Sequence, residues 1–381
     1  MPFDPLFPEL TATTLNELAD GYIFQNSFIA TPFQRQASAS GAYDPFGGGA
    51  QMQVPSIYAG LDGGFIEPGQ DVTLTRKQVI TASLFQPKLI EQHAPIEEFE
   101  LSVLNTGPAA RVGILESYLE QMLEGMDFQI EAAMFRHGQA AGPGVSDNRT
   151  DAIDGLSNAI NDGVTPSWDG NVFLTYGGST RNGVLGASLN STPVWLGDSS
   201  GNPAPPSYEA LLKLYKLPIG RPNHIQTSWS GYTSIAAAFQ RQQRYDVRLD
   251  QVINWSGIKF EDATIFDDDI TPSPNPKQSI ANLAPQSSIT TGTFVVPTGS
   301  PNGTNQLPTA GTTCTVGDPI WMLDMESWKY RPAATEDFNY KFMDPIRWPQ
   351  NPTMYSQFLR HALNWYCPTP RRNVAGYGIL S

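Results

Sequence analysis

Few side chains in this chain have the type and spacing that chemistry requires. Three consecutive aspartates, Asp267 to Asp269, carry enough charge to hold a cation, but the alternating acidic positions and the closing glutamate of a calcium loop are missing. Glu97, Glu98 and Glu100 lie in the run IEEFEL, where Glu98 and Glu100 would share one face of a strand, as paired carboxylates for acid–base hydrolysis could. We favour the simpler interpretations, a solvated charge run before a turn and a polar strand face.

The residues that bind metals or act as nucleophiles show no usable spacing. Two cysteines, Cys314 and Cys367, are too few for a disulfide framework or a structural zinc site. Cys367 lies beside prolines in WYCPTPRR, and we expect it to be a buried structural thiol and not a nucleophile. The histidines have no HxxxH or HxH spacing and cannot be assigned as metal ligands: they are His93, His137, His224 and His361.

The chain also lacks the short motifs that mark common enzyme classes. The glycine-rich turn at Gly47 to Gly49 is not followed by a helix with a lysine and a serine or threonine, so a phosphate cradle is not expected. No GxSxG, Walker loop, HExxH, or GxGxxG after a strand is present. We therefore predict that the protein is not an enzyme, with no catalytic, cofactor-binding or metal-binding residues and no cofactor.

Composition indicates a folded chain with an unusually weakly charged surface. With 381 residues, 40% hydrophobic and 11% aromatic, the chain can bury a real core in one large domain or in two or three smaller ones. The 34 glycines and 32 prolines predict many short strands and long ordered loops. Charged residues make up 16%, against about 25% in an average protein. This low share suits a subunit covered by its neighbours, and equally a loop-rich carbohydrate binder.

The balance of charge excludes some partners. The formal net charge of −14, without any basic tract, makes nucleic-acid binding an unlikely main role, because affinity for phosphate backbones comes largely from Lys and Arg clusters. The N-terminal sequence MPFDPLFPEL lacks the basic start and apolar run of a signal peptide. No stretch approaches the roughly 20 apolar residues that span a bilayer. We expect a soluble intracellular product that does not bind membranes.

The N-terminal third of the chain predicts an arm and a flap. The arm, residues 1–40, combines a short helical candidate, Thr11 to Ala19, with an extended aromatic segment, and it has too few periodic hydrophobic residues to be stable alone. The flap, residues 41–107, contains two alternating runs, Gln51 to Tyr58 and Val72 to Ala82, which predict an extended two-stranded hairpin with a long loop.

The strongest single element is a long helix from about Arg111 to His137. Apolar residues recur there at spacings of three and four, Pro108 precedes the helix and Gly138 follows it. At 1.5 Å per residue the helix would be about 40 Å long. We favour a single helix lying across a sheet over a coiled coil, because the apolar stripe lacks clean charge pairing at the flanking positions.

The remaining chain predicts a compact α+β module. Tyr208 to Leu217 and Ser230 to Tyr245 have helical patterns, while His224 to Trp229 and Val252 to Phe260 are strand candidates. The three aspartates Asp267 to Asp269 then lead into a long loop that runs through Gly311. The chain then ends in a run that suits a strand returning to the first module.

This order of elements resembles the tailed-bacteriophage major capsid protein family, with its Hong Kong ninety-seven type capsid fold. The stretches similar to that family are GGGAQMQVPSIYAGL and LTRKQVITASLFQPKLIEQHAPIEEFEL, VGILESYLEQMLEGMDFQIEAAMFRHG, DAIDGLSNAIND, Pro222 to Ser228 with AAFQRQQRYD, and FLRHALNWYCPTPRRNVAGYGI. The resemblance implies an α+β fold with these parts: N-terminal arm 1–40, E-loop flap 41–107, spine helix and peripheral domain 108–206, axial domain 207–345 with an insertion at about 271–316, and closing peripheral-domain strand 346–381.

The resemblance also implies a function. A major capsid protein self-assembles into pentamers and hexamers of an icosahedral shell that encloses phage double-stranded DNA without sequence-specific contact. Its other partners would be portal, scaffold or decoration proteins, and its location the virion after synthesis in the host bacterial cytoplasm. The expected assembly residues are the flap tip near Gly47 to Gly64, the arm around Tyr22 to Phe33, and the loops near Trp229 and Trp255.

Two alternatives stay open at this point. The chain could be another virion structural protein, such as a decoration or tail protein. It could also be a β-rich carbohydrate-binding module, in which Trp168, Trp195 and Trp321 would form the sugar platform. The long predicted helix argues against the carbohydrate-binding alternative.

Overall fold

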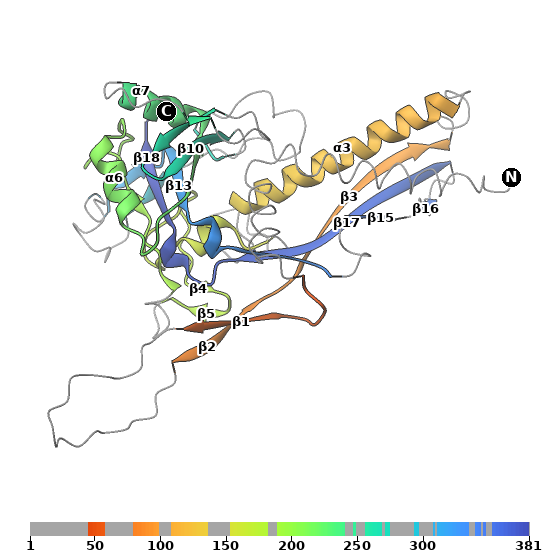
Figure 1. Cartoon of the computed structure of the whole chain (residues 1–381), viewed down its shortest axis with the longest axis horizontal. Coiled ribbons are helices and arrows are strands. Elements are labelled where there is room, and N and C mark those ends of the chain that lie inside the picture. Colours follow the sequence, from red (N-terminus) through yellow and green to blue (C-terminus); the bar gives the residue numbers. More distant parts are fainter. Residues whose placement is uncertain are drawn as a thin grey trace, which may run out of the picture.

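The fold consists of a compact part and an elongated part built on one long helix and two long strands (Figure 1). None of the helices in the described residues has the length and apolar character needed to cross a membrane. The predicted arm and much of the predicted insertion lie outside the described residues. The computed structural model describes residues 45–57, 79–98, 108–135, 153–181, 189–240, 247–248, 256–268, 271–274, 293–296, 308, 311–334, 340–343, 346–347 and 353–380.

The compact part is built on a mixed seven-stranded sheet covered by two helices. Helix α7 packs on β7, β10 and β13, and helix α6 packs on β18. Helix α6 begins where the Ser207 side chain accepts a hydrogen bond from the Ala210 amide, which satisfies one of the amides left free in the first turn. In order across the sheet, the strands are β6 (Val194–Trp195), β18 (Val374–Ile379), β13 (Asp318–Leu323), β7 (His224–Ser228), β10 (Ala263–Asp268), β9 (Ser256–Phe260) and β8 (Val247–Arg248); the helices are α6 (Tyr208–Lys216) and α7 (Trp229–Gln240).

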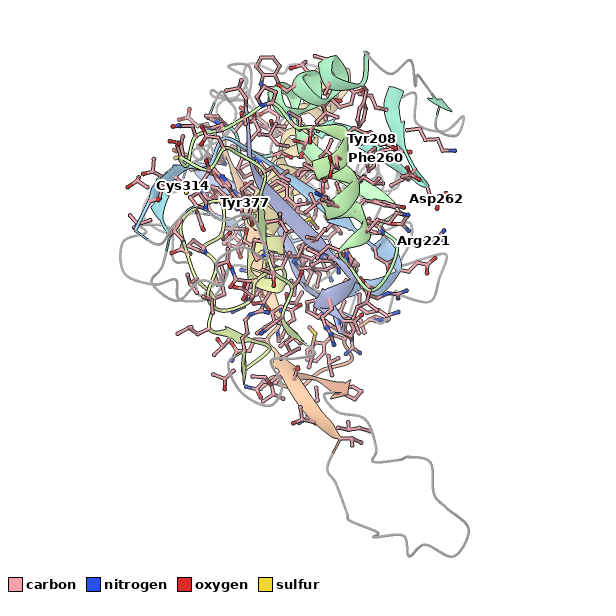
Figure 2. All side chains as sticks on the ribbon, turned by 90° about the vertical axis from the view of Figure 1, so that its left-hand side faces the viewer. Tyr208, Arg221, Phe260, Asp262, Cys314 and Tyr377 are labelled. Carbon is pink, nitrogen blue, oxygen red and sulfur yellow. The ribbon has the colours of Figure 1, made fainter. Side chains whose placement is uncertain are left out.

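These elements match the predicted α+β module closely. Helix α6 ends one residue before the predicted Leu217, while α7 begins at Trp229 and ends at Gln240, and residues 241–246 lie outside the description. The helices are held to the sheet by aromatic contacts around Phe260, whose ring centroid lies 5.6 Å from those of Tyr208 and Phe239. Figure 2 shows Tyr208 beside Phe260 at this edge of the molecule.

The elongated part carries the long helix. Helix α3 (Pro108–Phe135) has 28 residues, which corresponds to about 42 Å at 1.5 Å per residue, and it packs on the ten-residue strand β3 (Lys88–Glu97). This confirms the prediction of a single helix lying across a sheet. The residues that α3 buries at helical spacing are Leu119, Met122, Leu123, Met126 and Ile130.

Strand β3 pairs along its whole length with the longest strand of the chain. The antiparallel register runs from Lys88 opposite Leu363 to Glu97 opposite Met354. Three short strands pair with the other edge of that long strand and complete a five-stranded sheet. The strands are β17 (Met354–Tyr366), β14 (Lys329–Pro332), β15 (Lys341–Phe342) and β16 (Ile346–Arg347).

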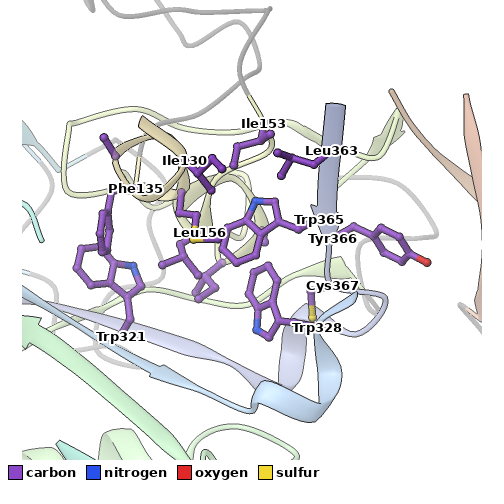
Figure 3. Packing of buried hydrophobic residues seen from close by; sticks show 14 of the residues in the cluster. Ile130, Phe135, Ile153, Leu156, Trp321, Trp328, Leu363, Trp365, Tyr366 and Cys367 are labelled. Atoms are coloured by element: carbon purple, nitrogen blue, oxygen red, sulfur yellow. The ribbon is translucent and has the colours of Figure 1, made fainter. Parts of the chain in front are cut away.

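Strand β13 joins the two parts because both of its faces are buried. Ile320 and Met322 belong to the core beneath α6 and α7, whereas Trp321 belongs to the core that α3 shares with the five-stranded sheet. The Trp321 ring lies 5.0 Å from that of Phe135, the last residue of α3. Figure 3 shows the two side chains next to each other. Because successive side chains of β13 point to opposite faces, this strand packs against the end of α3 on one face and against the core of the compact part on the other.

Stacked tryptophans fill the centre of this shared core. The rings of Trp328 and Trp365 lie 4.6 Å apart and nearly parallel (Figure 3). Such a pair adds about 0.5–1.5 kcal/mol to the stabilisation from burial alone. Smaller elements pack around this core: α4 (Leu156–Ala159), β4 (Thr175–Tyr176), β5 (Ser179–Thr180), the 3-10 helices η3 (Met325–Ser327) and η5 (Pro370–Arg372), and the hairpin of β11 (Thr293–Val295) and β12 (Thr313–Thr315).

The predicted flap contains an antiparallel pair of strands that projects from the rest of the molecule (Figure 1). Strand β1 (Met52–Ile57) pairs with β2 (Ile80–Phe85), with Met52 opposite Phe85 and Ile57 opposite Ile80. The first strand falls within the predicted run. The second strand extends beyond the predicted end at Ala82, and residues 58–78 lie outside the description.

The predicted closing strand, residues 346–381, needs a correction. It is not one strand returning to one module: β17 belongs to the five-stranded sheet, whereas β18 is an inner strand of the seven-stranded sheet. The chain turns between the two sheets at Pro368 and at the 3-10 helix η5, where prolines cannot donate the hydrogen bonds that would continue a ladder. The division of the chain into five domains remains a prediction.

Candidate assembly surface

Asp268 corrects the prediction of a solvated charge run. Asp267 is exposed, but Asp268 is buried and accepts hydrogen bonds from Gln226 Nε2 at 2.6 Å and Thr271 Oγ1 at 3.1 Å. Successive side chains of β10 point to opposite faces, so one aspartate of the run must face the protein. Asp269 lies outside the described residues.

Only part of the predicted glutamate pair lies within the described residues. Glu97 is exposed, and Glu98 forms an ion pair with Arg347 at 3.3 Å between Oε2 and Nη2. Glu100 lies outside the described residues. The part of the pair that the structure describes therefore agrees with a polar surface.

The histidines occupy three different environments. His93 is exposed, and His137 lies outside the description. His361 is buried, with Nε2 2.8 Å from the Tyr330 hydroxyl, and its Nδ1 accepts from the Tyr340 amide at 3.3 Å. Burial lowers the pKa of His224 to about 4. Within the described ranges, no group of three His, Cys, Asp or Glu side chains could hold a metal ion.

Both cysteines are buried free thiols, as predicted for Cys367. Burial raises the pKa of Cys367 to about 12 and that of Cys314 to about 11. Cys367 also lies 3.3 Å from the side-chain amide of Asn373. A thiolate is the reactive form, so neither side chain is poised as a nucleophile.

A buried cluster of hydroxyls around Asp318 was missed at the level of sequence. The Asp318 carboxylate accepts hydrogen bonds from Ser228 at 2.7 Å, Ser230 at 2.6 Å and Ser273 at 2.6 Å. These bonds compensate the buried carboxylate and hold residue 273, at the entrance to the predicted insertion, against the sheet. Because 90 residues separate Ser228 from Asp318, no local pattern could reveal the cluster.

A second missed feature is the buried guanidinium of Arg181. It donates to the main-chain carbonyl of Asn161 at 2.7 Å and to that of Ala159 at 3.2 Å, and it also reaches the carbonyls of Asn158 and Leu189. Burial lowers its pKa to about 10. The side chain holds the irregular segment after α3 in one shape and has no exposed surface to offer a ligand.

The tryptophans of the carbohydrate-binding alternative cannot form a sugar platform. Trp168, Trp195 and Trp321 are 5%, 1% and 0% exposed. The indole N–H groups of Trp168 and Trp195 donate to the carbonyls of Phe135 and Asp198. A stacking platform needs an accessible ring face, so the reason for that alternative is removed.

Among the described residues, the surface of the β1–β2 pair carries exposed apolar side chains. On the β1–β2 pair, Met52, Val54 and Phe85 face the protein and are buried, and the opposite face carries exposed Pro55 and Ala82 with Leu84 and Ile80 at 38% and 51% exposure. An isolated two-stranded pair is marginal in water. Large exposed apolar patches mark sites of protein contact.

The outer face of the five-stranded sheet also carries exposed side chains among the described residues. Alternate residues of β3 point toward α3, and the others point away: Leu89 is 53% exposed, as against buried Ala94 and Ile96. An ion pair between Glu91 and Arg360, 2.5 Å apart, crosses this outer face. The face is thus partly apolar and partly ionic. Protein interfaces likewise combine an apolar core with a polar rim.

The predicted assembly residues are only partly described. Gly47 to Gly49 precede β1, and Phe46 bridges Ala333 beside β14, so these glycines lie at the base of the β1–β2 pair and not at its tip. The antiparallel register puts the tip beyond Ile57 and Ile80, and residues 58–64 lie outside the description. Trp229 begins α7 and is half-buried. The segment Tyr22 to Phe33 and Trp255 are not among the described residues.

Comparison with known proteins finds similarity of structure and not of sequence. No protein-family model matches the chain, and no curated protein sequence matches it. The capsid of cyanophage A-1(L) aligns with a TM-score of 0.51 at 10% identity, over 87% of this chain and 88% of that chain. The capsid of a native GTA particle aligns with a TM-score of 0.49 at 7% identity, over 91% of both chains. The SrpI encapsulin of Synechococcus elongatus aligns with a TM-score of 0.47 at 9% identity, over 88% and 84%.

Proposed function

We propose that this chain, which has the phage capsid fold, is a major capsid protein that self-assembles into pentamers and hexamers of an icosahedral shell enclosing phage double-stranded DNA. The observation that carries the proposal is the extent of the shared fold. It covers 87% of the chain, and therefore the elongated part as well as the compact part.

The distribution of apolar surface supports the proposal. The outer face of the β1–β2 pair, with Leu84 and Ile80, and the outer face of the five-stranded sheet, with Leu89, are left to solvent in the single chain. Stable protein interfaces bury on the order of 1,200–2,000 Å² in total. A projecting pair of strands reaches beyond the body of its own subunit (Figure 1), so a second copy of the chain is a natural cover for it.

The charge of the chain fits an enclosing shell. A net charge of −14 repels DNA at long range, so DNA can be held inside without sticking to the wall or being read by sequence. The further partners would be portal, scaffold or decoration proteins. The location would be the virion, after synthesis in the host bacterial cytoplasm, and the role would be structural and not enzymatic, without a cofactor.

Electron microscopy of the purified full-length protein tests the proposal. We expect closed particles with five-fold and six-fold clusters. Leu84→Asp should reduce particle formation, because it puts a charge on the outer face of the β1–β2 pair. Leu380→Asp changes a comparably exposed leucine in the compact part, at 44% against 38%, and serves as the matched control. A protein that stays a monodisperse monomer at high concentration, with and without phage partners, contradicts the proposal.

A count of copies per virion separates the remaining alternative. A shell protein is present in hundreds of copies, whereas a tail or decoration protein follows a different stoichiometry. Quantitative mass spectrometry of purified virions measures this number directly.

A further inference from the structure

We infer that each subunit fixes the direction of its own β1–β2 pair through contacts at the base of that pair, and that the residues making these contacts are positioning residues for assembly. The second half of this inference rests on the proposed function. The contacts come from three segments: the β4–β5 hairpin, the end of β17, and the segment after α3. They are described in turn.

An aromatic cluster holds the last residue of β2. The Phe85 ring stacks on Tyr366, at the end of β17, with centroids 4.9 Å apart and planes 17° apart. It meets Tyr176 of β4 edge to face at 5.3 Å. Figure 3 shows Tyr366 pointing to the opposite side from Trp365. Phe85, Tyr176 and Tyr366 belong to the same buried hydrophobic core as the stacked tryptophans, and Phe85 is almost completely buried in it.

Hydrogen bonds attach β2 to the β4–β5 hairpin and the hairpin to the residue that follows β17. The Leu84 amide donates to the Gly177 carbonyl at 2.7 Å. The Tyr176 hydroxyl accepts from the Cys367 amide at 2.8 Å, just after β17. The hairpin is thus bound on one side to the projecting strands and on the other to the longest strand of the molecule.

The turn of that hairpin is shaped to let the strands approach. Gly177 and Gly178 both have positive φ, +55° and +72°, as a tight two-residue hairpin turn requires. A Cβ on Gly177 would lie 2.8 Å from Phe85 Cζ and 2.8 Å from Ser83 Cβ. A Cβ on Gly178 would have its nearest neighbour, Leu84 Cβ, at 3.9 Å. Both positions favour glycine for backbone reasons, but position 177 alone also needs it for contact with β2.

A side-chain hydrogen bond from β17 holds the bend between β2 and β3 in place. The Asn364 side-chain amide donates to the Gln86 carbonyl at 2.7 Å and lies 3.3 Å from the Asp154 carboxylate. Asp154 also accepts from Asn158 Nδ2 at 3.2 Å. Pro87 follows Gln86 and restricts the backbone further. The bend is therefore held from β17 and from the segment after α3 together.

These contacts matter because a two-stranded pair has no intrinsic direction relative to the body that carries it. The anchored base converts a flexible projection into a rigid one. If the pair reaches a neighbouring subunit, its angle decides where that neighbour sits, and small changes in angle accumulate around a closed shell. We therefore expect the base contacts to set the curvature of the assembly as well as the direction of the pair.

Pulsed electron paramagnetic resonance on the unassembled full-length chain tests the direction. Spin labels are attached at Ile80→Cys, at the far end of the β1–β2 pair, and at Glu97→Cys, at the far end of β3. The native thiols at Cys314 and Cys367 are buried with raised pKa and should not react. We expect one narrow distance distribution.

Gly177→Ala and Gly178→Ala then form a matched pair. Both place alanine at positive φ in the same turn, at a similar backbone cost of about 1 kcal/mol. Gly177→Ala should shift or at least double the width of the distance distribution, while Gly178→Ala should leave it unchanged. Phe85→Leu removes the aromatic contacts and leaves the turn unchanged, and it should shift or broaden the distance distribution as Gly177→Ala does. This second variant keeps the test decisive if Gly177→Ala does not fold. Unchanged distributions in both Gly177→Ala and Phe85→Leu overturn the inference.

Particle diameters separate this inference from the proposed function. If the labelled pair moves in Gly177→Ala and the particles become heterogeneous in diameter, both stand. If particles form with unaltered diameter although the pair moves, the assembly part of the inference is wrong and the proposed function survives. If neither the native chain nor any variant forms particles, with or without phage partners, the proposed function is wrong. The distance measurement still decides whether the base contacts set the direction of the pair.

Discussion

Replacing His224 by phenylalanine should make the free energy of unfolding less sensitive to acid, because His224 is a titratable side chain buried in the seven-stranded sheet. His224 is buried at the start of β7, where its ring stacks on Phe266 at 5.0 Å. Thr264 of β10 and Leu323 of β13 lie opposite it in the register. His224→Phe keeps a ring against Phe266 and removes the titrating group.

The magnitude follows from the shifted pKa. Burial lowers the pKa of His224 from 6.5 to about 4, with Gln226 opposing part of the shift. Between these values the unfolded chain binds a proton that the native protein does not, so the free energy of unfolding rises with pH across this window and falls on acidification. At pH 4.5 the loss relative to pH 7.5 is on the order of 2–3 kcal/mol.

Urea unfolding followed by tryptophan fluorescence at pH 4.5 and pH 7.5 measures the effect. We expect the difference in unfolding free energy between His224→Phe and the native chain to change by about 2–3 kcal/mol in favour of the variant at the lower pH. His93→Phe, at an exposed position, is the control and should show a much smaller change. Equal differences at both pH values, or an NMR titration of the His224 ring near pH 6.5, would refute the reasoning.

The remaining predictions concern packing and buried polar groups. Trp365→Ala should lower the free energy of unfolding by about 3–5 kcal/mol, because it removes a buried ring stacked at 4.6 Å; calorimetry or urea titration measures this. Asp318→Ala should destabilise by about 3 kcal/mol or more by leaving buried hydroxyls without their acceptor, whereas Asp267→Ala, at an exposed position of β10, should stay within about 0.5 kcal/mol. Cys314 and Cys367 should be inert to a thiol reagent at pH 8 in the native protein and react once it is unfolded in guanidinium; rapid native reaction would contradict their burial.

The elements governed by local pattern were predicted well from the sequence. Helix α3 was found because its buried residues recur at spacings of three and four, and α6 because its leucines lie within a few residues of each other. Strand β1 and the strand at His224 were found for the same reason. In each case the information lies inside one element.

The candidate surface was predicted in outline and corrected in detail. The sequence predicted a projecting pair of strands, but it assigned Gly47 to Gly49 to the tip, because turn residues were read without the pairing register. The base contacts of Phe85 with Tyr176 and Tyr366 join residues that are 91 and 281 positions apart in the sequence (176 − 85 and 366 − 85). No periodicity connects residues at such separations.

What the sequence by itself determined was therefore the type and order of the elements, a long helix, a projecting pair of strands and a compact α+β module, together with a weakly charged, acidic chain. Only the tertiary structure decided that the last segment divides between two sheets and that Asp318 gathers three serines. It also decided that Asp268 and the three tryptophans of the carbohydrate-binding alternative are buried. The physical reason is the range of the interactions: helix and strand patterns arise from neighbours along the chain, whereas burial and strand pairing depend on which distant segment closes over each face.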